Sequence, residues 1–363
     1  MKEKVLVAMS GGVDSSVTLL KILEMGYDAI GVTMKLWEYE DVGGNIANEN
    51  NCCSTSEINN AKLVCDRMDV PHYTIDFSET FKKDVVENFV DEYMKGRTPN
   101  PCVRCNSFIK WDAFINQANI LGAKYIATGH YARIDNINNE YIIKKGVDNK
   151  KDQAYVLWGI PKETIARTIL PLGDLTKSEV REIAREYKLE TAEAPESMEI
   201  CFVADNNYKR FIKEYATERT SSIKKGKTID QKGNMLGENE GYINYTIGQR
   251  KGIGISNPTP LYVKEIDHKS NTIVVSEKES LYKDLCNVSN INWLIDTPSF
   301  PFSVNCQIRY NGIPASGKLI KNGEMHSVVF DKPQLAITPG QSIVFYDNER
   351  LLGGGIIELP KYE

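Results

Sequence analysis

A run of serine, glycine and aspartate at residues 10–16 has the composition of a phosphate-binding turn. It reads Ser-Gly-Gly-Val-Asp-Ser-Ser, and it follows an apolar segment at residues 5–9 that predicts a strand. The residues after it, 17–23, have the pattern of a helix. Backbone N–H groups at a helix start bind anions, and the two glycines let the main chain come close because they have no Cβ. We therefore predict a phosphate site, with an ordinary glycine turn as the alternative.

The turn has no lysine of the Walker A type, which separates it from the nucleoside triphosphatases whose lysine reaches the β- and γ-phosphates. It resembles instead the pyrophosphatase loop of enzymes that cleave ATP between its α- and β-phosphates. That resemblance implies adenylation, in which AMP is attached to an oxygen to make it a better leaving group.

A second candidate site is the stretch 98–106, which contains Cys102 and Cys105. Its two prolines are expected to keep the segment extended, so that a loop presents both thiols. Arg104 and a helix expected to begin near Ser107 would favour the thiolate, the reactive form of cysteine. The Cys-x-x-Cys spacing fits half a zinc site, a redox dithiol, cluster ligands or a chance occurrence.

The sequence predicts different roles for the remaining cysteines. Cys201 follows Met198, Glu199 and Ile200 and is a third candidate for thiol chemistry. Residues 52 and 53 are adjacent cysteines, a poor spacing for two ligands of one ion. For Cys65, Cys286 and Cys306 we predict burial in the core, because free cysteine is among the most buried residue types.

Composition limits the class of protein. The chain has 363 residues, eight cysteines and no apolar signal or membrane-spanning segment, so we predict a cytoplasmic protein with reduced thiols. A net charge of −5 argues weakly against a nucleic-acid partner. Residues 208–280, however, hold 13 Lys and Arg against 9 Asp and Glu, an excess that fits either a polyanion-binding surface or a solvated basic face.

The first two hundred residues alternate between predicted strands and helices, which is typical of an α/β domain with a doubly wound parallel sheet. The predicted strands are 5–9, 29–34, 72–76 and 125–128. Ligands in such sheets bind beyond the carboxyl ends of the strands. We expect the turn at 10–16 to meet residues 34–37 and 129–131 in one crevice there.

After residue 204 the pattern changes to short β-like runs separated by glycine, asparagine and proline. Residues 303–310, 327–330 and 342–346 predict strands of a small barrel or sandwich. We therefore expect three domains: a catalytic domain at 1–205, a small basic α+β or β domain at 206–282, and a C-terminal β-barrel at 283–363.

In order along nearly the whole chain, these motifs resemble those of the tRNA-specific 2-thiouridylases. The matching stretches are 10–16, 34–37 with 52–54, 97–106, 127–131, 151–153, 200–202, 245–250 and 307–310. The resemblance implies that ATP adenylates the 2-oxo group of the wobble uridine of tRNA. Sulfur then replaces that oxygen, and AMP and pyrophosphate are released.

The resemblance also implies site residues. The expected ATP-binding residues are Ala8, Met9, Ser10, Gly11, Gly12, Val13, Asp14, Ser15, Met34 and Gly129. Asp14 is expected to position magnesium or pyrophosphate, because a carboxylate beside phosphates suits a hard cation.

Sulfur is expected to arrive as a persulfide on Cys201, with Cys105 as the thiol that attacks or resolves it. Either the persulfide attacks carbon 2 directly, or Cys105 releases hydrosulfide from it. Some family members carry aspartate where this chain has Cys102. The three cysteines together could bind a [4Fe-4S] cluster; alternatively Cys102 is a tolerated variant beside the base.

By the same resemblance the partners are tRNA and a cysteine desulfurase or sulfur-relay protein as donor. Residues expected against the flipped-out uridine are Asn100, Pro101 and Cys102. Other expected tRNA contacts are His130, Lys151, Asp152, Gln153, Arg309, Tyr310 and Gln341.

Three alternatives stay open from the sequence. Another pyrophosphatase-loop enzyme, such as an amide-forming or argininosuccinate-type synthetase, would explain residues 10–16 but not the cysteines. A tRNA thiolase for a different base would keep the chemistry. A nucleotide-binding module without catalysis would need only the first domain.

Overall fold

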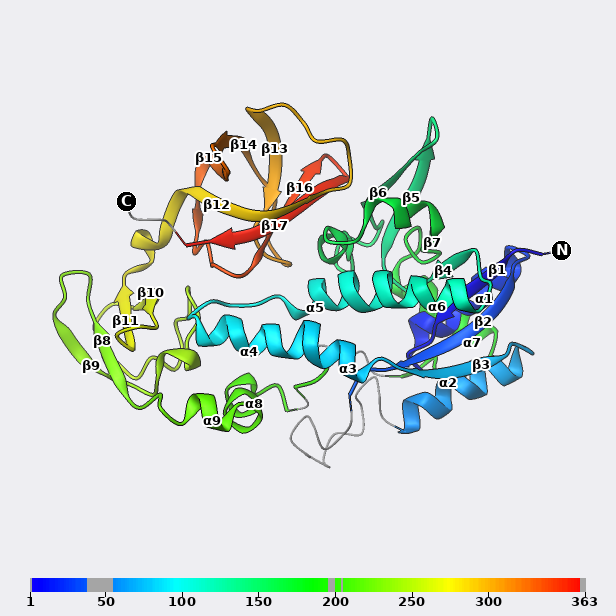
Figure 1. Ribbon diagram of the computed structural model, residues 1–363, viewed down its shortest axis with the longest axis horizontal. Coiled ribbons are helices and arrows are strands. Elements are labelled where there is room, and N and C mark those ends of the chain that lie inside the picture. Colours follow the sequence, from blue (N-terminus) through cyan, green and yellow to red (C-terminus); the bar gives the residue numbers. More distant parts are fainter. Residues whose placement is uncertain (1, 38–54, 195–199, 204, 360–363) are drawn as a thin grey trace. The chain divides into compact units, whose positions relative to one another are not determined.

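The computed structural model describes residues 2–37, 55–194, 200–203 and 205–359 (Figure 1). The chain divides into two compact units. Unit 1 comprises Met1–Val85, Cys102–Asn207 and Glu349–Leu352, and unit 2 comprises Val86–Pro101, Tyr208–Asn348 and Gly353–Glu363. None of the helices in the described ranges is long and apolar enough to cross a membrane.

Unit 1 is built on a five-stranded sheet in which every neighbouring pair is parallel, in the order β3-β2-β1-β4-β7. The strands are β1 (Lys4–Ala8), β2 (Asp28–Lys35), β3 (His72–Asp76), β4 (Tyr125–Ala127) and β7 (Thr168–Ile169). Helices alternate with the first three strands, so the predicted α/β class is confirmed for this part of the chain.

The central strand β1 is apolar from Val5 to Ala8 because neighbours cover both of its faces there. Its Val5 and Val7 lie in one core with Leu19 of α1 (Val13–Glu24) and with Ala61 and Val64 of α2 (Thr55–Arg67). The sheet therefore holds the carboxyl end of β1, and the turn after it, on a rigid base.

Helix α1 begins directly after Gly12, four residues earlier than predicted. On its other side Val17 packs against Val180 and Ala184 of α7 (Lys177–Glu186). A capping box fixes the start of α7: the Thr176 hydroxyl accepts a hydrogen bond from the Glu179 N–H, and the Glu179 carboxylate accepts one from the Thr176 N–H. These contacts place the first turn of α7 beside that of α1.

A continuous helix runs through α5 (Pro101–Arg104), the π-helical η3 (Cys105–Ala113) and α6 (Phe114–Ile120). The prediction of an extended loop with a helix beginning near Ser107 was wrong. Proline is tolerated in the first turn of a helix, where its missing N–H would have no partner within the helix. Pro101 thus begins the helix that it was expected to exclude.

The remaining regular elements of unit 1 surround the sheet. They are α3 (Ser78–Phe81), η2 (Lys82–Val86), whose last residue belongs to unit 2, the hairpin β5 (Ala132–Ile137) and β6 (Glu140–Lys145), η4 (Ala154–Leu157) and η5 (Lys162–Arg167).

Unit 2 contains the helices α4 (Glu87–Met94), α8 (Tyr208–Tyr215) and α9 (Thr217–Thr220), and a four-stranded sheet in the order β10-β11-β8-β9. The strands are β8 (Gly226–Ile229), β9 (Met235–Asn239), β10 (Tyr262–Asp267) and β11 (Thr272–Ser276). Val263, Ile273 and Val275 form the core of this sheet with Tyr245 and Ile253.

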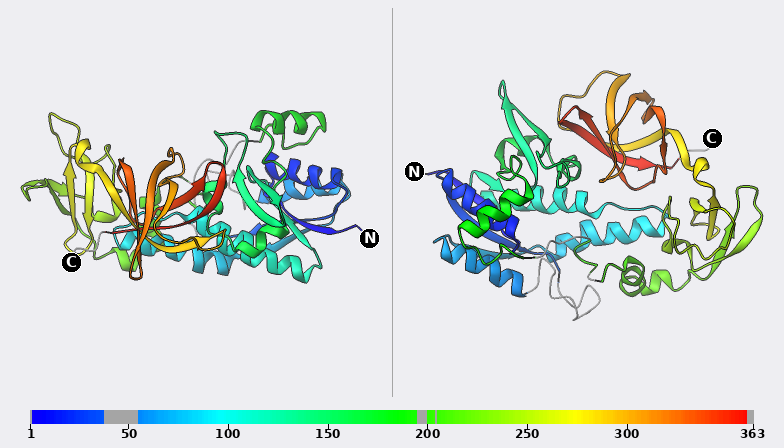
Figure 2. Two further views of the ribbon diagram at one scale, coloured as in Figure 1. Left: turned by 90° about the horizontal axis from the view of Figure 1, so that it is seen from above. Right: turned by 180° about the vertical axis from the view of Figure 1, so that it is seen from behind.

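Six strands close into a barrel in the order β12-β15-β14-β13-β16-β17, and β12 pairs with β17 to complete it (Figure 2). They are β12 (Tyr282–Trp293), β13 (Phe302–Gln307), β14 (Ala315–Asn322), β15 (Met325–Leu335), β16 (Ser342–Asp347) and β17 (Arg350–Glu358). The predicted barrel is confirmed. The predicted strand 303–310, however, ends at Gln307, so Arg309 and Tyr310 lie in a turn.

Candidate active site

The turn after β1 has the close backbone approach that its glycines indicated. Gly11 has φ of +79°, and a Cβ there would lie 2.3 Å from the carbonyl oxygen of Glu57. The hydroxyls of Ser15 and Ser16 donate to the Gly12 carbonyl at 3.0 and 2.9 Å. Ser10 is exposed, whereas those two serines are buried. The turn therefore presents Ser10 and the start of α1 outward, as an anion site requires.

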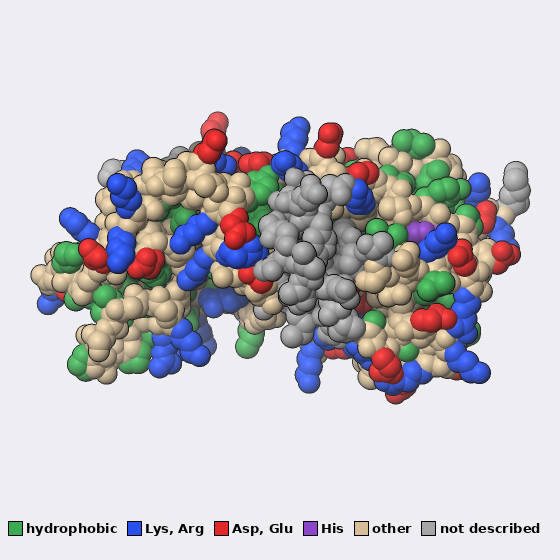
Figure 3. All heavy atoms as spheres, turned by 90° about the horizontal axis from the view of Figure 1, so that it is seen from below, with side chains coloured by type: hydrophobic (Ala, Val, Ile, Leu, Met, Phe, Trp, Pro, Cys, Tyr) green, Lys and Arg blue, Asp and Glu red, His purple; other side chains and the backbone are tan. Residues whose placement is uncertain are grey.

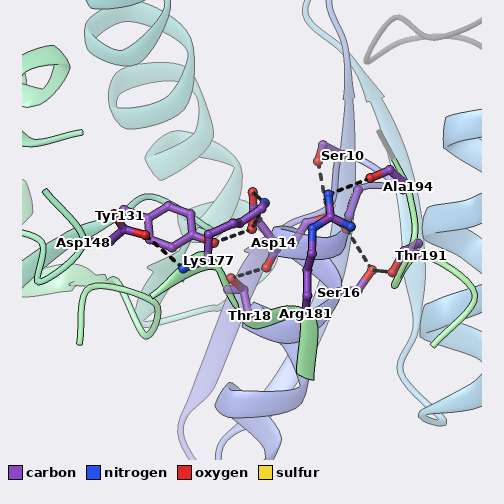
Figure 4. A network of polar contacts seen from close by, with 12 residues as sticks. Ser10, Asp14, Ser16, Thr18, Tyr131, Asp148, Lys177, Arg181, Thr191 and Ala194 are labelled. Carbon is purple, nitrogen blue, oxygen red and sulfur yellow. Dashed lines mark hydrogen bonds and ion pairs between the residues drawn. The ribbon is translucent and has the colours of Figure 1, made fainter. Parts of the chain in front are cut away.

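Asp14 is the acidic centre of this site (Figure 4). Its two carboxylate oxygens lie 2.7 and 2.8 Å from Nζ of Lys177, the first residue of α7. The Tyr131 hydroxyl donates to the same carboxylate at 2.7 Å. The Lys177 side chain is 12% exposed and that of Asp14 is 35% exposed. A partly desolvated ion pair thus lies at the first turns of two helices.

Lys177 is a residue of this candidate site that the sequence reasoning missed. It lies 163 residues from Asp14, and no local motif surrounds it. Its backbone N–H donates to the Asp148 carboxylate at 3.1 Å, which fixes the start of α7 to a neighbouring loop. The turn has no Walker A lysine of its own, but α7 supplies a lysine beside it.

Gly129 follows β4, and the backbone of Asp14 packs against it. A Cβ at Gly129 would lie 3.1 Å from the Cβ and the carbonyl carbon of Asp14. Met34, the other residue expected to line the nucleotide site, is buried near the end of β2. The structure thus brings the ends of β1 and β4 together as predicted.

Arg181 lies one turn beyond Lys177 on α7 and holds the chain that leads toward Cys201. Its guanidinium donates to the carbonyl oxygens of Ala192 and Ala194 at 2.6 and 3.1 Å. The Thr191 hydroxyl donates to the Ser16 hydroxyl at 2.9 Å, within the first turns of α1. One helix face therefore links the phosphate turn to the segment before the third cysteine (Figure 4).

The three candidate cysteines differ in exposure. Cys102 is exposed, Cys105 is 8% exposed and Cys201 is partly exposed. Cys201 is followed by Phe202, whose buried ring packs edge-on against Phe81 at 5.6 Å between centroids. Only one of the two thiols on the α5–η3 helix is presented to solvent, so the prediction that both are presented was wrong.

Arg104, which is expected to favour the thiolate, contacts Asp84 and Phe108. Its Nε donates to the Asp84 carbonyl at 2.5 Å, and its guanidinium lies 4.6 Å from the centre of the Phe108 ring.

The structure gives no sign of an assembled metal site within the ranges it describes, where no three His, Cys, Asp or Glu side chains cluster as ligands. Cys102, Cys105 and Cys201 therefore do not meet as a ligand set in this conformation. The adjacent cysteines 52 and 53, Ser54, Met198 and Glu199 lie outside the described residues.

Four of the expected tRNA contacts lie in unit 1. His130 is 6% exposed; its Nδ1 is 2.7 Å from the Thr128 hydroxyl, and desolvation lowers its pKa well below the usual value. The Asp152 carboxylate accepts from the N–H groups of Gly146 and Ala154. The Gln153 side-chain oxygen accepts from the Tyr131 N–H at 3.0 Å. His130, Asp152 and Gln153 thus have structural contacts. Lys151 lies partly exposed in the turn before Asp152, and its N–H donates to the Asp148 carbonyl at 3.0 Å.

Of the other expected contacts, Cys102 lies in unit 1, and the rest lie in unit 2: Asn100, Pro101, Arg309, Tyr310 and Gln341. Thr98, Arg309 and Gln341 line a cavity of about 290 Å³ within that unit. Tyr310 is 40% exposed, as a stacking surface for a base requires. Asn100 is partly buried and Pro101 is buried. The structure therefore brings Arg309 and Gln341 together with the segment before Asn100.

The charge on the face drawn in Figure 3 is mixed. Lys and Arg side chains are interspersed there with Asp and Glu side chains.

A parallel sheet with a glycine- and serine-rich turn after its central strand defines a nucleotide-binding α/β domain. Family models match almost all of the chain: the tRNA methyl transferase HUP domain at residues 3–205, the tRNA methyl transferase PRC-barrel domain at 209–277, and the aminomethyltransferase beta-barrel domain at 283–357.

Two similar proteins that match over nearly their full length are named tRNA-specific 2-thiouridylase MnmA. That of Carboxydothermus hydrogenoformans is 46% identical, with 98% of each chain covered. That of Clostridioides difficile is 44% identical, with 99% of each chain covered. The chain belongs to the family of tRNA-specific 2-thiouridylases, which confirms the resemblance seen in its motifs.

Proposed function

We propose that this protein uses ATP to replace the 2-oxo group of the wobble uridine of tRNA with sulfur. Family membership supports the reaction, and the Asp14–Lys177 pair beside the phosphate turn is the observation that carries the mechanism. A pyrimidine carbonyl oxygen leaves poorly, so the first step attaches AMP to it and releases pyrophosphate.

The polyphosphate would lie against Ser10 and the start of α1, where N–H groups and the helix dipole favour negative charge. Lys177 would neutralise the negative charge that develops on the leaving pyrophosphate. This neutralisation lowers the activation free energy of adenylation. Asp14 holds that ammonium in place. A carboxylate beside phosphates also fits Mg²⁺, and Asp14 would hold the ion, which would supply further neutralisation of phosphate charge.

The sulfur step requires two thiols. A terminal persulfide sulfur on Cys201 attacks carbon 2, and AMP leaves with the former carbonyl oxygen. The Cys105 thiolate then attacks the Cys201 sulfur, which breaks the sulfur–sulfur bond, frees the 2-thiouridine and leaves a Cys105–Cys201 disulfide. A cellular dithiol reductant restores both thiols. In the second route Cys105 releases hydrosulfide first, and the same disulfide forms.

Cys105 is 8% exposed, so either route requires the α5–η3 helix or the tRNA to open access to it. A cysteine desulfurase or a sulfur-relay protein would load Cys201, whose partial exposure suits transfer from another protein.

The reaction is tested with purified protein, ATP, a persulfide donor and tRNA that lacks the modification. Nucleoside analysis is expected to show 2-thiouridine at the wobble position, with one AMP formed per sulfur. Sulfur on cytidine alone, or no sulfur, would reject the proposal. Anaerobic iron and sulfide analysis of the wild type and of Cys102→Ala then separates the persulfide route from a cluster: an active, iron-free enzyme supports the former.

We also propose the three-domain division 1–205, 206–282 and 283–363, and the tRNA-contacting roles of Asn100, Pro101, Cys102, Lys151, Arg309 and Tyr310. For the arginine and the lysine, the salt dependence of tRNA binding is the test. Lys151→Ala with Arg309→Ala is expected to weaken binding and to lower the salt slope by about two, because each substitution removes one phosphate contact.

A further inference from the structure

The segment that leads into the expected base-contact residues is held by the barrel of its own unit. The Thr98 N–H donates to the Pro339 carbonyl at 2.9 Å. Gln341 Nε2 donates to the carbonyl oxygens of Thr98 and Pro99 at 3.1 and 2.8 Å. Asn100 is the next residue, so three hydrogen bonds fix the chain immediately before it.

The turn that carries Gln341 is itself fixed. The Gln341 N–H donates to the Thr338 carbonyl at 3.2 Å, and its carbonyl accepts from the Ile357 N–H at 2.9 Å. Gly340 has φ of +90°, and a Cβ there would lie 2.7 Å from the Thr98 carbonyl oxygen. Only glycine lets this turn approach Thr98 so closely. The backbone of the turn then directs the Gln341 side chain toward the main chain of Thr98 and Pro99.

Ion pairs hold the same segment at Arg97, the residue before Thr98. Arg97 Nε donates to the Glu92 carboxylate at 2.6 Å, and its guanidinium also pairs with Glu358 of β17. The Ser289 hydroxyl of β12 donates to Glu358 at 2.5 Å. Arg97 and Glu92 are 14% and 13% exposed, so this anchor is largely removed from water.

We propose that Gln341 is a positioning residue for base recognition. It acts through the main chain of Thr98 and Pro99 and not through a direct contact with the tRNA. This inference rests on the proposed contact of Asn100, Pro101 and Cys102 with the uridine. The prolines at 99 and 101 have no N–H, so within 99–101 only Asn100 can donate from its backbone. Carbonyl oxygens are therefore the groups by which this short segment can be held, and an external donor must hold them.

The chemistry of the amide favours this role over a phosphate contact. Both neighbours of Nε2 are carbonyl oxygens, so the NH2 group must face them, and each of its two hydrogens has a partner. The side chain keeps only an acceptor, Oε1, for any other contact. Phosphate oxygens are acceptors too, so Gln341 could donate to the tRNA backbone only by releasing the segment before Asn100.

The test replaces Gln341 with methionine in the full-length protein, because methionine has a similar length and no donor, and the backbone bonds of the turn remain. Hydrogen exchange of the peptide spanning residues 96–104 is expected to rise at least fivefold. The turnover number for thiolation is expected to fall at least tenfold, while the dissociation constant for tRNA stays within twofold. Gln341→Glu, which puts an acceptor toward the two carbonyls, is expected to show the same pattern.

Gln334→Met is the matched control, because Gln334 of β15 donates only to the nearby Lys332 carbonyl at 2.8 Å. It is expected to leave exchange and turnover unchanged. A loss of tRNA affinity equal to the loss of activity, with unchanged exchange at 96–104, would overturn the proposal and make Gln341 a direct tRNA contact. Unchanged exchange and turnover would also overturn it. The exchange measurement needs no tRNA. It therefore tests the role of Gln341 even if the wild-type protein shows no thiolation activity.

Discussion

The ammonium of Lys177 lies between the two carboxylate oxygens of Asp14, at 2.7 and 2.8 Å. The aspartate comes from the phosphate turn and the lysine from a helix 163 residues later. The pair makes the acidic centre of the turn nearly neutral before any phosphate arrives. Without Lys177, Asp14 would repel the anion that the turn is shaped to bind.

Lys177→Met is therefore expected to lower thiolation by 10- to 100-fold, or about 1.4 to 2.7 kcal/mol of transition-state stabilisation. It is also expected to raise KM for ATP. Steady-state kinetics with tRNA in excess measures both. Arg185→Ala is the control, because Arg185 lies on the same helix and forms an exposed ion pair with Glu193. Equal activity of Lys177→Met and wild type would exclude the lysine from the chemistry.

Gly129→Ala is expected to weaken ATP binding several-fold. The new Cβ would lie 3.1 Å from the backbone and the Cβ of Asp14, closer than ordinary van der Waals separation, so α1 must move away from β4. Isothermal titration with a non-hydrolysable ATP analogue measures the affinity, and thermal unfolding shows whether the fold is retained. A fully folded variant with unchanged affinity would show that this contact does not shape the nucleotide site.

The pH dependence of stability depends on Glu57, whose pKa desolvation raises to about 7. Since the folded pKa lies above the unfolded value, the charged form destabilises the folded state. That penalty is full above pH 7 and disappears as the pH falls through 7 toward 4.5. Glu57→Gln is expected to raise the free energy of unfolding at pH 8 by on the order of 1 to 3 kcal/mol.

Denaturant unfolding at pH 8 and at pH 4.5 tests this. The advantage of Glu57→Gln should largely vanish at the lower pH, while Glu79→Gln, at an exposed site, should have little effect at either. An advantage that is the same at both values would mean that the charge of Glu57 carries no penalty.

Thiol labelling should follow the exposure of the cysteines. With iodoacetamide, Cys102 is expected to react before Cys105, Cys65, Cys286 and Cys306, which are buried. The labelling rate of Cys102 should increase with pH as the thiol ionises. Peptide mass spectrometry of quenched samples measures each site.

Labelling in guanidinium chloride is the reference, because unfolding makes the sites equivalent. Faster labelling of Cys105 than of Cys102 in the folded protein would show that the η3 helix opens readily.

The sequence predicted the sheet well because buried parallel strands are apolar runs with clear limits. β1, which is buried from Val5 to Val7, occupies Lys4–Ala8, one residue from the predicted 5–9 at each end. The phosphate turn was found for the same reason: its residues are contiguous, so their composition is visible. Local patterns of this kind need no knowledge of the tertiary structure.

Features that depend on distant contacts could not be predicted in this way. Lys177 has a role only because α7 packs against α1, and nothing next to it in the sequence indicates that contact. Pro101 was misinterpreted because proline both ends and begins helices, and the residues after it decide between the two. Arg309 leaves β13 because the Gln307 amide donates to the carbonyls of Arg309 and Tyr310 and turns the chain.

The last barrel strand, β17, is shared: residues 349–352 group with unit 1 and residues from 353 onward with unit 2. During synthesis the barrel cannot close, and unit 1 cannot be completed, until this strand has left the ribosome. The barrel must therefore wait in a partly folded state, with β12 lacking its β17 partner and exposed to pairing with other chains. A ribosome that stalls before Arg350 would release a chain whose barrel is open along β12.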